Sequence, residues 1–345
     1  MQFSFYLPCY WPDTGVHAHV MYKEMLDQAV RAEQLGFAML GVPEHHFINY
    51  LVHPSPLLTA VKVASVTERI PIITSVLVLP FLDMRRIAGE IAQADCLTDG
   101  RLHIGVGRGA FRYEFDRFGV TPAESRAKFD DSLALLKALL SETEVSWDSP
   151  YYNFAPLTIT PRPLQQPYPP IWIAALKYQA IYHSVLNGYH VMTTPLRDPF
   201  AVARMQAGAF ADAVAAGGAD TAGRMFSMLR MLYVAKDEAD RRAKLEIAYA
   251  NHRRFINVFD TPGEVVDGAI VPLDVAETVE EIGEALLIGT AAECIDKLAP
   301  YAELGIFDLM LNMSFGASHA DVLASMDRFA ADVAPHFSGT RTAQP

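Results

Sequence analysis

The residues with the most distinctive chemistry follow an apolar stretch, 38–42, near the N-terminus. They read Pro43-Glu44-His45-His46-Phe47. An imidazole can give or take a proton near neutral pH, and Glu44 could orient or charge it. Glutamate and histidine are also metal-ligand types, so a metal site is the alternative. Adjacent histidines on a strand point to opposite faces, and no HExxH spacing occurs. Side-chain chemistry alone does not choose between His45 and His46.

A second cluster, rich in glycine, follows the apolar stretch 102–106. It reads Gly105-Val106-Gly107-Arg108-Gly109-Ala110. Three glycines in five residues let the backbone approach a flat or phosphorylated ligand closely. Arg108 lies inside this loop and Arg126 lies near the start of the next predicted helix, and two guanidiniums beside free N–H groups suit a phosphate. The alternative is a tight strand exit that carries a surface arginine.

The same loop fits the dinucleotide-binding pattern G-x-G-x-x-A. That pattern belongs to the first strand–helix turn, with an acidic residue at the end of the next strand. In this chain the loop follows the fourth predicted strand, and the acids at a suitable distance, Asp130 and Asp131, fall on a predicted helix. The sequence therefore disfavours a nicotinamide site of that type.

Residues Thr74 to Pro80 end the third predicted strand. The small side chains at its start would leave room for a planar ring in the mouth of a barrel. They are also ordinary barrel filling, which is the preferred interpretation without other observations. Neither a G-x-S-x-G elbow nor a zinc-type cysteine spacing occurs in the sequence.

Four helix–strand junctions indicate the fold that must position these groups. In each, a helical pattern ends at a glycine and an apolar run begins at once, at 33–42, 97–106, 185–194 and 302–311. Glycine ends a helix cheaply in the left-handed conformation, and continuous apolar runs are typical of parallel strands buried on both faces. The predicted strands are 2–7, 38–42, 70–79, 102–106, 170–174, 189–193, 226–234 and 306–312. The predicted helices are 20–35, 55–68, 84–97, 124–140, 177–187, 199–216, 238–256, 290–304 and 319–335.

About eight strand–helix repeats predict an α/β fold, a (β/α)8 TIM barrel with insertions, and the competitor is a doubly wound open sheet. Residues 144–169 form one insertion, with six prolines and room for a short hairpin. Residues 257–288 are polar and acidic and form the second, which we expect to act as a lid. Because no convincing linker divides the chain, we predict a single domain over 1–345.

Composition excludes several classes of function. Lys and Arg number 28 against 40 Asp and Glu, which gives a net charge of −12, and 51% of the residues are hydrophobic. This composition predicts a globular protein and argues against nucleic acid as a partner. No apolar stretch approaches the ~20 residues needed to span a bilayer, and the N-terminus lacks secretory-signal features. Three cysteines are too few for a disulfide framework, so we expect a cytoplasmic protein.

Taken together and in order, these residues resemble the bacterial luciferase-like flavin monooxygenases. No single motif is decisive, but the ordered set covers most of the chain. The segments that carry the resemblance are Glu44–Phe47, Ser75–Pro80, Gly100–Gly109, Phe115–Gly119, Ser125–Arg126, Pro170–Ala175, Ile288–Cys294 and the last helix.

The resemblance implies a (β/α)8 barrel that binds reduced FMN at its carboxyl mouth. A separate flavin reductase would supply the FMN, O2 would add at the flavin C4a carbon, and the resulting peroxide would oxidise a small organic substrate. His45 would act at the active site, Arg108 and Arg126 would bind phosphate, and a non-proline cis peptide would fall at Ser75–Val76. Family members are usually dimers, so a homodimer is expected.

The expected site residues fall into three groups, and no metal ligand is expected. The catalytic pair is His45 and Glu44. The cofactor-binding residues are Ser75, Val76, Gly107, Arg108, Gly109, Ala110, Arg126, Ala175, Leu176 and Lys177. The expected substrate-contacting residues, chosen as an apolar and aromatic wall, are Tyr10, Trp11, Phe47, Phe111 and Tyr178.

The chain also departs from the luciferase pattern. Gly107 stands where luciferase has a reactive cysteine, which argues against light emission with aldehydes. Leu176, Lys177 and Ala180 replace a Glu-Ser pair and a threonine at the phosphate site, where Lys177 could supply a cation.

Several alternatives stay open at this stage. Deazaflavin F420 is a less favoured cofactor, and an F420- or nicotinamide-linked dehydrogenase on the same barrel is the runner-up activity. A non-catalytic flavin-binding subunit is a third possibility, against which the retained His45 argues. The apolar wall fits aldehyde, terpene, aromatic and sulfur substrates equally.

Overall fold

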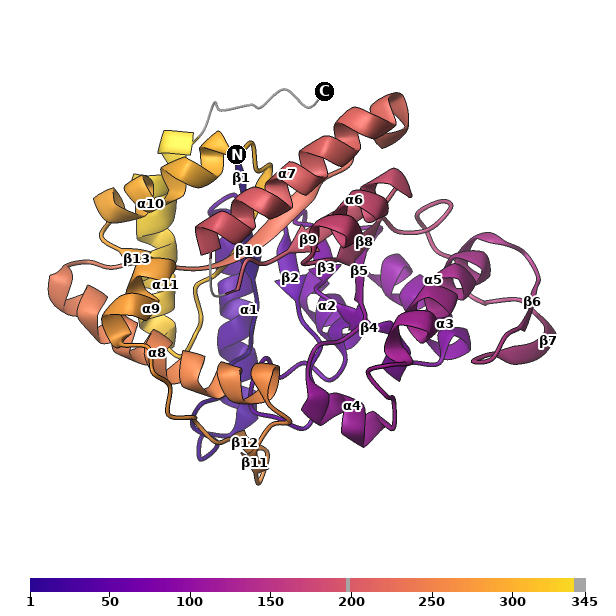
Figure 1. Ribbon diagram of the computed structural model, residues 1–345, viewed down its shortest axis with the longest axis horizontal. Helices are drawn as coiled ribbons and strands as arrows, with labels where there is room; N and C mark the ends of the chain where they lie inside the picture. The colour runs from indigo at the N-terminus through magenta and orange to yellow at the C-terminus, as the bar shows by residue number, and fades with distance from the viewer. Residues whose placement is uncertain (197–198, 338–345) are drawn as a thin grey trace.

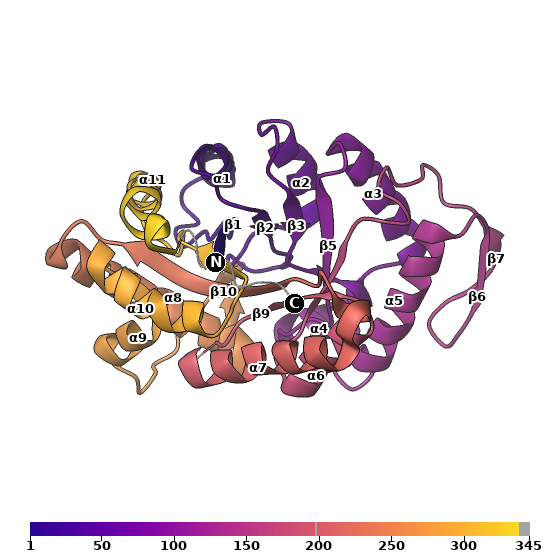
Figure 2. The same cartoon turned by 90° about the horizontal axis from the view of Figure 1, so that it is seen from above.

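At the centre of the computed structural model, which describes residues 1–196 and 199–337, parallel strands close into a barrel (Figures 1 and 2). Within the described residues, eight strands form the closed circuit, and β10 pairs with both β9 and β14 to complete it. The predicted TIM barrel is confirmed. The barrel strands, in spatial order, are β1 (Gln2–Tyr6), β2 (Leu40–Val42), β3 (Ile72–Thr74), β5 (Leu102–Gly107), β8 (Ile171–Ala174), β9 (His190–Thr193), β10 (Phe226–Val234) and β14 (Asp308–Asn312).

Helices alternate with these strands and cover the outside of the barrel (Figure 2). The four junction glycines all have positive φ, between 71° and 83°, as the junction pattern predicts: Gly36, Gly100, Gly188 and Gly305. The helices that match the predicted ones are α1 (Ala18–Gln34), α2 (Pro56–Ala64), α3 (Met84–Leu97), α5 (Ser125–Ser141), α6 (Tyr178–Leu186), α7 (Pro199–Gly217), α8 (Glu238–Asp260), α10 (Ala291–Glu303) and α11 (His319–Arg328).

The structure corrects the predicted strand 70–79. The peptide bond between Ser75 and Val76 is cis, as the family resemblance implies, and it divides this run into β3 and the short β4 (Leu77–Val78). Both pieces still pair with β5, so the chain keeps its place in the barrel. The predicted last helix is also shortened, because α11 ends at Arg328 and the chain continues as a π-helical turn, 329–333, and a 3₁₀ turn, 334–337.

Both predicted insertions contain regular structure. Residues 144–169 hold the expected hairpin, β6 (Val145–Asp148) and β7 (Asn153–Leu157). Residues 257–288 hold three elements that the sequence analysis did not predict: a hairpin of β11 (Val265–Val266) and β12 (Ala269–Ile270), α9 (Val279–Ala285), and the start of β13 (Leu287–Gly289), which pairs with β10 outside the barrel circuit. A short helix, α4 (Arg112–Phe118), was also missed.

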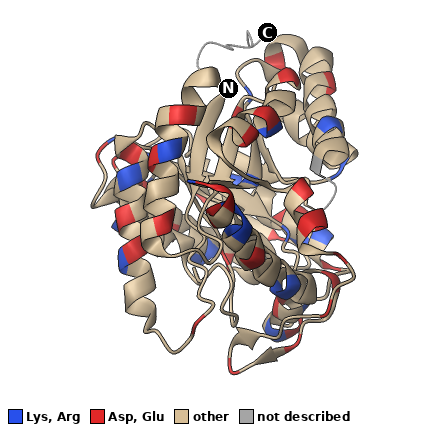
Figure 3. Cartoon of the chain, turned by 90° about the vertical axis from the view of Figure 1, so that its left-hand side faces the viewer, with Lys and Arg blue, Asp and Glu red and all other residues tan. Residues whose placement is uncertain are grey.

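The segments that follow the strand ends gather on one side of the molecule. In Figure 1, α4 and the β11–β12 hairpin lie at the bottom, opposite the N-terminus of β1. On the face formed by the C-terminal helices, basic and acidic residues are interspersed, so the net negative charge does not collect into one patch there (Figure 3). Within the described residues, no helix is long and apolar enough to cross a membrane.

A buried carboxyl group joins three strands at the end of the barrel opposite this side. Asp308 of β14 accepts hydrogen bonds from Ser4 at 2.8 Å and from Ser227 at 2.5 Å. Burial raises the pKa of Asp308 from 3.8 to about 6, against the opposing effect of the two hydroxyl donors. Because the folded-state pKa is raised, its stabilising contribution is present at low pH and is lost as pH rises towards about 6.

One buried histidine, His53, and two partly buried ones titrate in the opposite sense over the same range. Burial lowers the pKa of His53, His103 and His190 to about 4. Their neutral forms stabilise the fold above pH 6.5, and that contribution is lost as pH falls towards about 4. The effect of Asp308 is therefore visible only as a difference between variants.

We expect Asp308→Asn to be stabilised relative to the wild type as pH rises, because asparagine keeps the polar contacts without a charge to bury. The difference in free energy of unfolding should grow by roughly 2 kcal/mol between about pH 4.5 and pH 7.5. Urea unfolding at several pH values measures it. Asp296→Asn, at an exposed position of α10, should show a flat difference. A flat difference for Asp308→Asn would contradict the assignment.

Candidate active site

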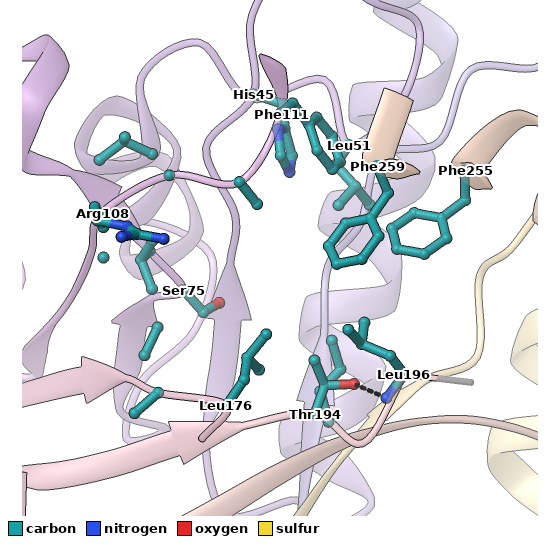
Figure 4. Close-up of a pocket in the computed structure, with 18 of the residues that line it drawn as sticks. His45, Leu51, Ser75, Arg108, Phe111, Leu176, Thr194, Leu196, Phe255 and Phe259 are labelled. Carbon is teal, nitrogen blue, oxygen red and sulfur yellow. Dashed lines mark hydrogen bonds between the residues drawn. The ribbon is translucent and has the colours of Figure 1, made fainter. Parts of the chain in front are cut away.

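One cavity of about 1020 Å³ opens at the carboxyl ends of the barrel strands. The loops after β2, β5 and β8 line it, together with residues of α5, α8 and α9. Figure 4 shows its two sides: Arg108 lies at one end, Phe255 and Phe259 lie at the other, and Ser75 lies between them. The cavity is therefore long enough to bring a cationic end and an aromatic end together in one space.

The floor of the cavity is formed where β3 breaks and β4 begins. Thr74 Oγ1 lies 2.9 Å from both N and O of Gly105, which ties β3 to β5. A Cβ atom on Gly107 would lie 2.7 Å from Cγ2 of Val76, so only glycine at this position lets β5 pack this closely against the segment that begins β4. The Ser75 hydroxyl is buried beside the cavity and has no hydrogen-bond partner among the described residues. The floor therefore has no side chain at Gly107 and has one polar atom beside it without a protein partner.

Three cationic side chains line one end of the cavity. Arg108, in the loop after β5, is exposed and has no carboxylate partner within the described part of the chain. Arg126, near the start of α5, pairs with Asp130 at 2.8 Å, and both are more than half exposed. Lys177 immediately precedes α6. These groups could bind a phosphate, although Arg126 would share its charge with Asp130.

The ten predicted cofactor-binding residues all line this one cavity. The structure thus brings together four separate segments of the sequence. They are Ser75 and Val76, Gly107 to Ala110, Arg126, and Ala175 to Lys177. That these residues bind a cofactor stays a prediction.

His45 is held beside the floor by a carboxylate and an aromatic ring. Its Nδ1 lies 3.1 and 3.2 Å from the two carboxylate oxygens of Glu114, which is almost completely buried. A carboxylate only accepts, so Nδ1 carries the proton and Nε2 remains for a ligand. The Phe111 ring stacks on the imidazole with centroids 4.3 Å apart and planes at 14° (Figure 4). The ring can therefore exchange a proton at Nε2 while its orientation stays fixed.

Glu44 contacts the other histidine. Its Oε1 lies 2.9 Å from Nε2 of His46, and its Oε2 accepts a hydrogen bond from the Val78 backbone at 3.0 Å. Glu44 therefore orients His46 and braces the chain after β2 against β4, whereas Glu114 orients His45. The sequence analysis did not single out Glu114, because it lies on the unpredicted helix α4. The described residues contain no cluster of three or more His, Cys, Asp or Glu that could hold a metal ion.

Of the five residues predicted to contact substrate, Phe111 lines the cavity. The other four are not part of its lining: Tyr10, Trp11, Phe47 and Tyr178. Phe47 has a positive φ of 64°, and its side chain is 53% exposed. Trp11 and Tyr178 donate their polar hydrogens to a backbone carbonyl and to a carboxylate near the surface. Their contact with substrate stays a prediction that these positions do not support.

Sequence reasoning missed the residues of α8 that complete the cavity. Asn251, Phe255 and Phe259 recur every four residues on α8, and all three line the cavity. This i, i+4, i+8 spacing places them on one face and could have identified them. The predicted lid, 257–288, also borders the cavity, through Glu277 and Ile282 among others. Its movement stays a prediction.

The fold and the site define a TIM barrel with a ligand cavity at its carboxyl mouth. The profile of the family described as luciferase-like monooxygenase matches residues 1–307, and the chain belongs to this family. It is an enzyme, an oxidoreductase of the luciferase-like monooxygenase family that incorporates oxygen from O2.

Individual relatives agree with this assignment. The chain is 29% identical to the oxygenase component of flavin-dependent trigonelline monooxygenase from Acinetobacter baylyi, over 93% of this chain and 91% of that protein. It superposes on the monooxygenase RslO1 from Streptomyces bottropensis with a TM-score of 0.86 and 25% identity, covering 98% of this chain and all of that one. An F420-dependent secondary alcohol dehydrogenase shares the fold alone, with a TM-score of 0.74, 17% identity, and coverage of 96% of this chain and 98% of that one. The fold by itself therefore does not decide the cofactor.

We expect Gly107→Ala to disturb the cavity floor, because its Cβ would displace Val76. The free energy of unfolding should fall by roughly 1–3 kcal/mol. The control is Gly208→Ala in α7, where nothing lies within 4 Å of the new Cβ and a gain of up to about 1 kcal/mol is expected. Urea denaturation compares the two, and equal effects would show that the floor is not tightly packed.

Proposed function

We propose that this chain is the oxygenase of a two-component monooxygenase that uses reduced FMN, supplied by a separate flavin reductase, and O2 to oxidise a small organic substrate. The observation that carries the proposal is the arrangement of one cavity, in which a flat floor lies between a cationic end and His45. Similarity to a protein named an oxygenase component supports the separate reductase. From the family resemblance we also infer a homodimer, and from the low cysteine count a cytoplasmic location.

The cavity fits FMN in shape and in charge. The flat floor at Val76 and Gly107 suits a planar ring system, and the unpartnered Ser75 hydroxyl suits one of its polar atoms. Arg108, Arg126 and Lys177 would hold the phosphate. When bound in reduced form, the flavin supplies two electrons and the atom with which O2 combines.

His45 is the group placed to control protons at the reacting centre. The carboxylate of Glu114 fixes Nδ1, so a proton can be held or released only at Nε2, on the cavity side. The same carboxylate would stabilise the imidazolium by a charged hydrogen bond. Phe111 and Tyr50 cover the imidazole, with ring centroids 4.3 and 6.2 Å from it, and keep bulk water from its faces.

Arg108→Ala should weaken the binding of reduced FMN by roughly 1.5–3 kcal/mol, the range for a lost charged hydrogen bond. This corresponds to an increase in Kd of about 10- to 150-fold. An anaerobic titration measures it, with Arg112→Ala as the matched control. Arg112 is an exposed arginine of α4 that pairs with Asp116 and does not line the cavity. Equal affinity for FMN in the wild type and Arg108→Ala would refute the phosphate site. Tighter binding of reduced F420 than of reduced FMN would replace the proposed cofactor.

His45→Ala should keep its affinity for reduced FMN but uncouple oxygen consumption from substrate oxidation, with release of hydrogen peroxide. The reason is that the buried carboxylate of Glu114 fixes the His45 ring at the cavity, and alanine removes the proton-exchanging group there. Oxygen uptake and peroxide formation with a generic flavin reductase measure the coupling. His19→Ala, on the exposed face of α1, serves as the control. Unchanged coupling in His45→Ala would remove His45 from the mechanism.

A further inference from the structure

The end of the cavity opposite Arg108 is built from aromatic rings. We call this set the aromatic end: Tyr50, Phe111, Phe255 and Phe259. Their contacting ring centroids lie 4.9 to 6.4 Å apart. Figure 4 shows Phe255 and Phe259 projecting from α8 towards the side where His45 and Phe111 lie. A ligand at the aromatic end would therefore be close to His45 and away from the cationic end.

Three rings of the aromatic end form a corner, and the Tyr50 ring lies at an intermediate tilt, 48° to Phe111 and 40° to Phe255. Phe255 and Phe259 are stacked, with 23° between their planes. The Phe111 ring lies at 66° and 88° to them. Such a corner offers a face to one side of a flat ring and an edge to another, the two arrangements that aromatic rings prefer. A saturated chain would gain only the burial of its surface there.

One polar group in this region has no partner. Asn251 lies one helical turn before Phe255 on the same face of α8, and it is only 4% exposed. Its side-chain amide lines the cavity, and no hydrogen bond joins it to another of the described residues. With no partner on the protein, the amide is available to bind something that enters the cavity. An amide both donates and accepts, and a carbonyl or carboxamide substituent matches it.

We propose that the aromatic end binds a planar aromatic substrate whose carbonyl or carboxamide substituent hydrogen-bonds to Asn251. The name substrate rests on the proposed monooxygenase function, whereas the binding itself does not. Asn251 is then the residue that selects the substituent, and Phe255 and Phe259 select the ring. His45 lies on the same side of the cavity as the bound ring, where oxygen transfer would take place.

Binding to the protein without flavin tests the proposal directly, by calorimetry with three probes. 2-Naphthamide carries both features, decahydronaphthalene-2-carboxamide lacks the aromatic ring, and 2-methylnaphthalene lacks the amide. We expect 2-naphthamide to bind about 3- to 10-fold more tightly than either of the other two. Equal affinity for all three probes would overturn the proposal.

Two variants assign the effect to the named side chains. Asn251→Leu should weaken 2-naphthamide to the level of 2-methylnaphthalene and should not weaken 2-methylnaphthalene. Phe259→Leu should abolish the preference for the aromatic over the saturated carboxamide. The controls are Asn153→Leu on the exposed hairpin and Phe118→Leu on α4, neither of which lines the cavity. If the first two variants behave like these controls, the proposal is wrong.

A separate titration with reduced FMN distinguishes this proposal from the proposed function. If FMN binds and the probes show no preference, the substrate class is wrong and the monooxygenase proposal stands. If the probes bind as expected and neither FMN nor F420 binds, the aromatic end is confirmed as a ligand site and the proposed cofactor is wrong.

Discussion

The close approach of Val76 to Gly107 is the constraint on which the rest of the site depends. The cis peptide turns the chain after β3, and the resulting β4 can pair with β5 only because position 107 has no side chain. This packing leaves no side chain at position 107 and places Ser75, whose buried hydroxyl has no partner among the described residues, beside the cavity. A cysteine at position 107, as in luciferase, would have to displace Val76. The close packing of this floor therefore requires a residue without a thiol side chain at position 107.

Two buried glutamates then fix the histidines on the neighbouring loop. The Glu114 carboxylate accepts hydrogen bonds from Nδ1 of His45 and, at 2.7 Å, from the backbone N–H of His46. One carboxylate therefore fixes both the imidazole ring and the backbone beside it. Glu44 joins His46 to the backbone of β4. The loop after β2 is thereby tied to the floor and to α4. The imidazole and the flat floor therefore belong to one rigid arrangement, which reduces the cost of ordering the site when a ligand binds.

Short sequence patterns were enough to predict the barrel, whereas contacts between residues far apart in the sequence could not be predicted. The glycine junctions and apolar runs each lie within ten residues, and they located the strands and most helices. The loop Gly105–Ala110 was likewise recognisable because its chemistry is contiguous in sequence. Glu114 was missed because α4 spans only seven residues, too few for a clear apolar period. The exposed orientation of Phe47 was out of reach, because its positive φ is a backbone property that residue type does not reveal.

The two ends of the cavity differ in the helix that contributes to them. The floor, the arginines and Phe111 come from the units around β3 to α5, whereas Phe255 and Phe259 come from α8, which continues into the insertion after Asp260. Segments outside the barrel strands tolerate change better than the strands do. Substitutions on one face of α8 can therefore alter the ligand class without disturbing the packing of Val76 on Gly107. The face that carries Asn251 is thus where specificity can change at least cost to the fold.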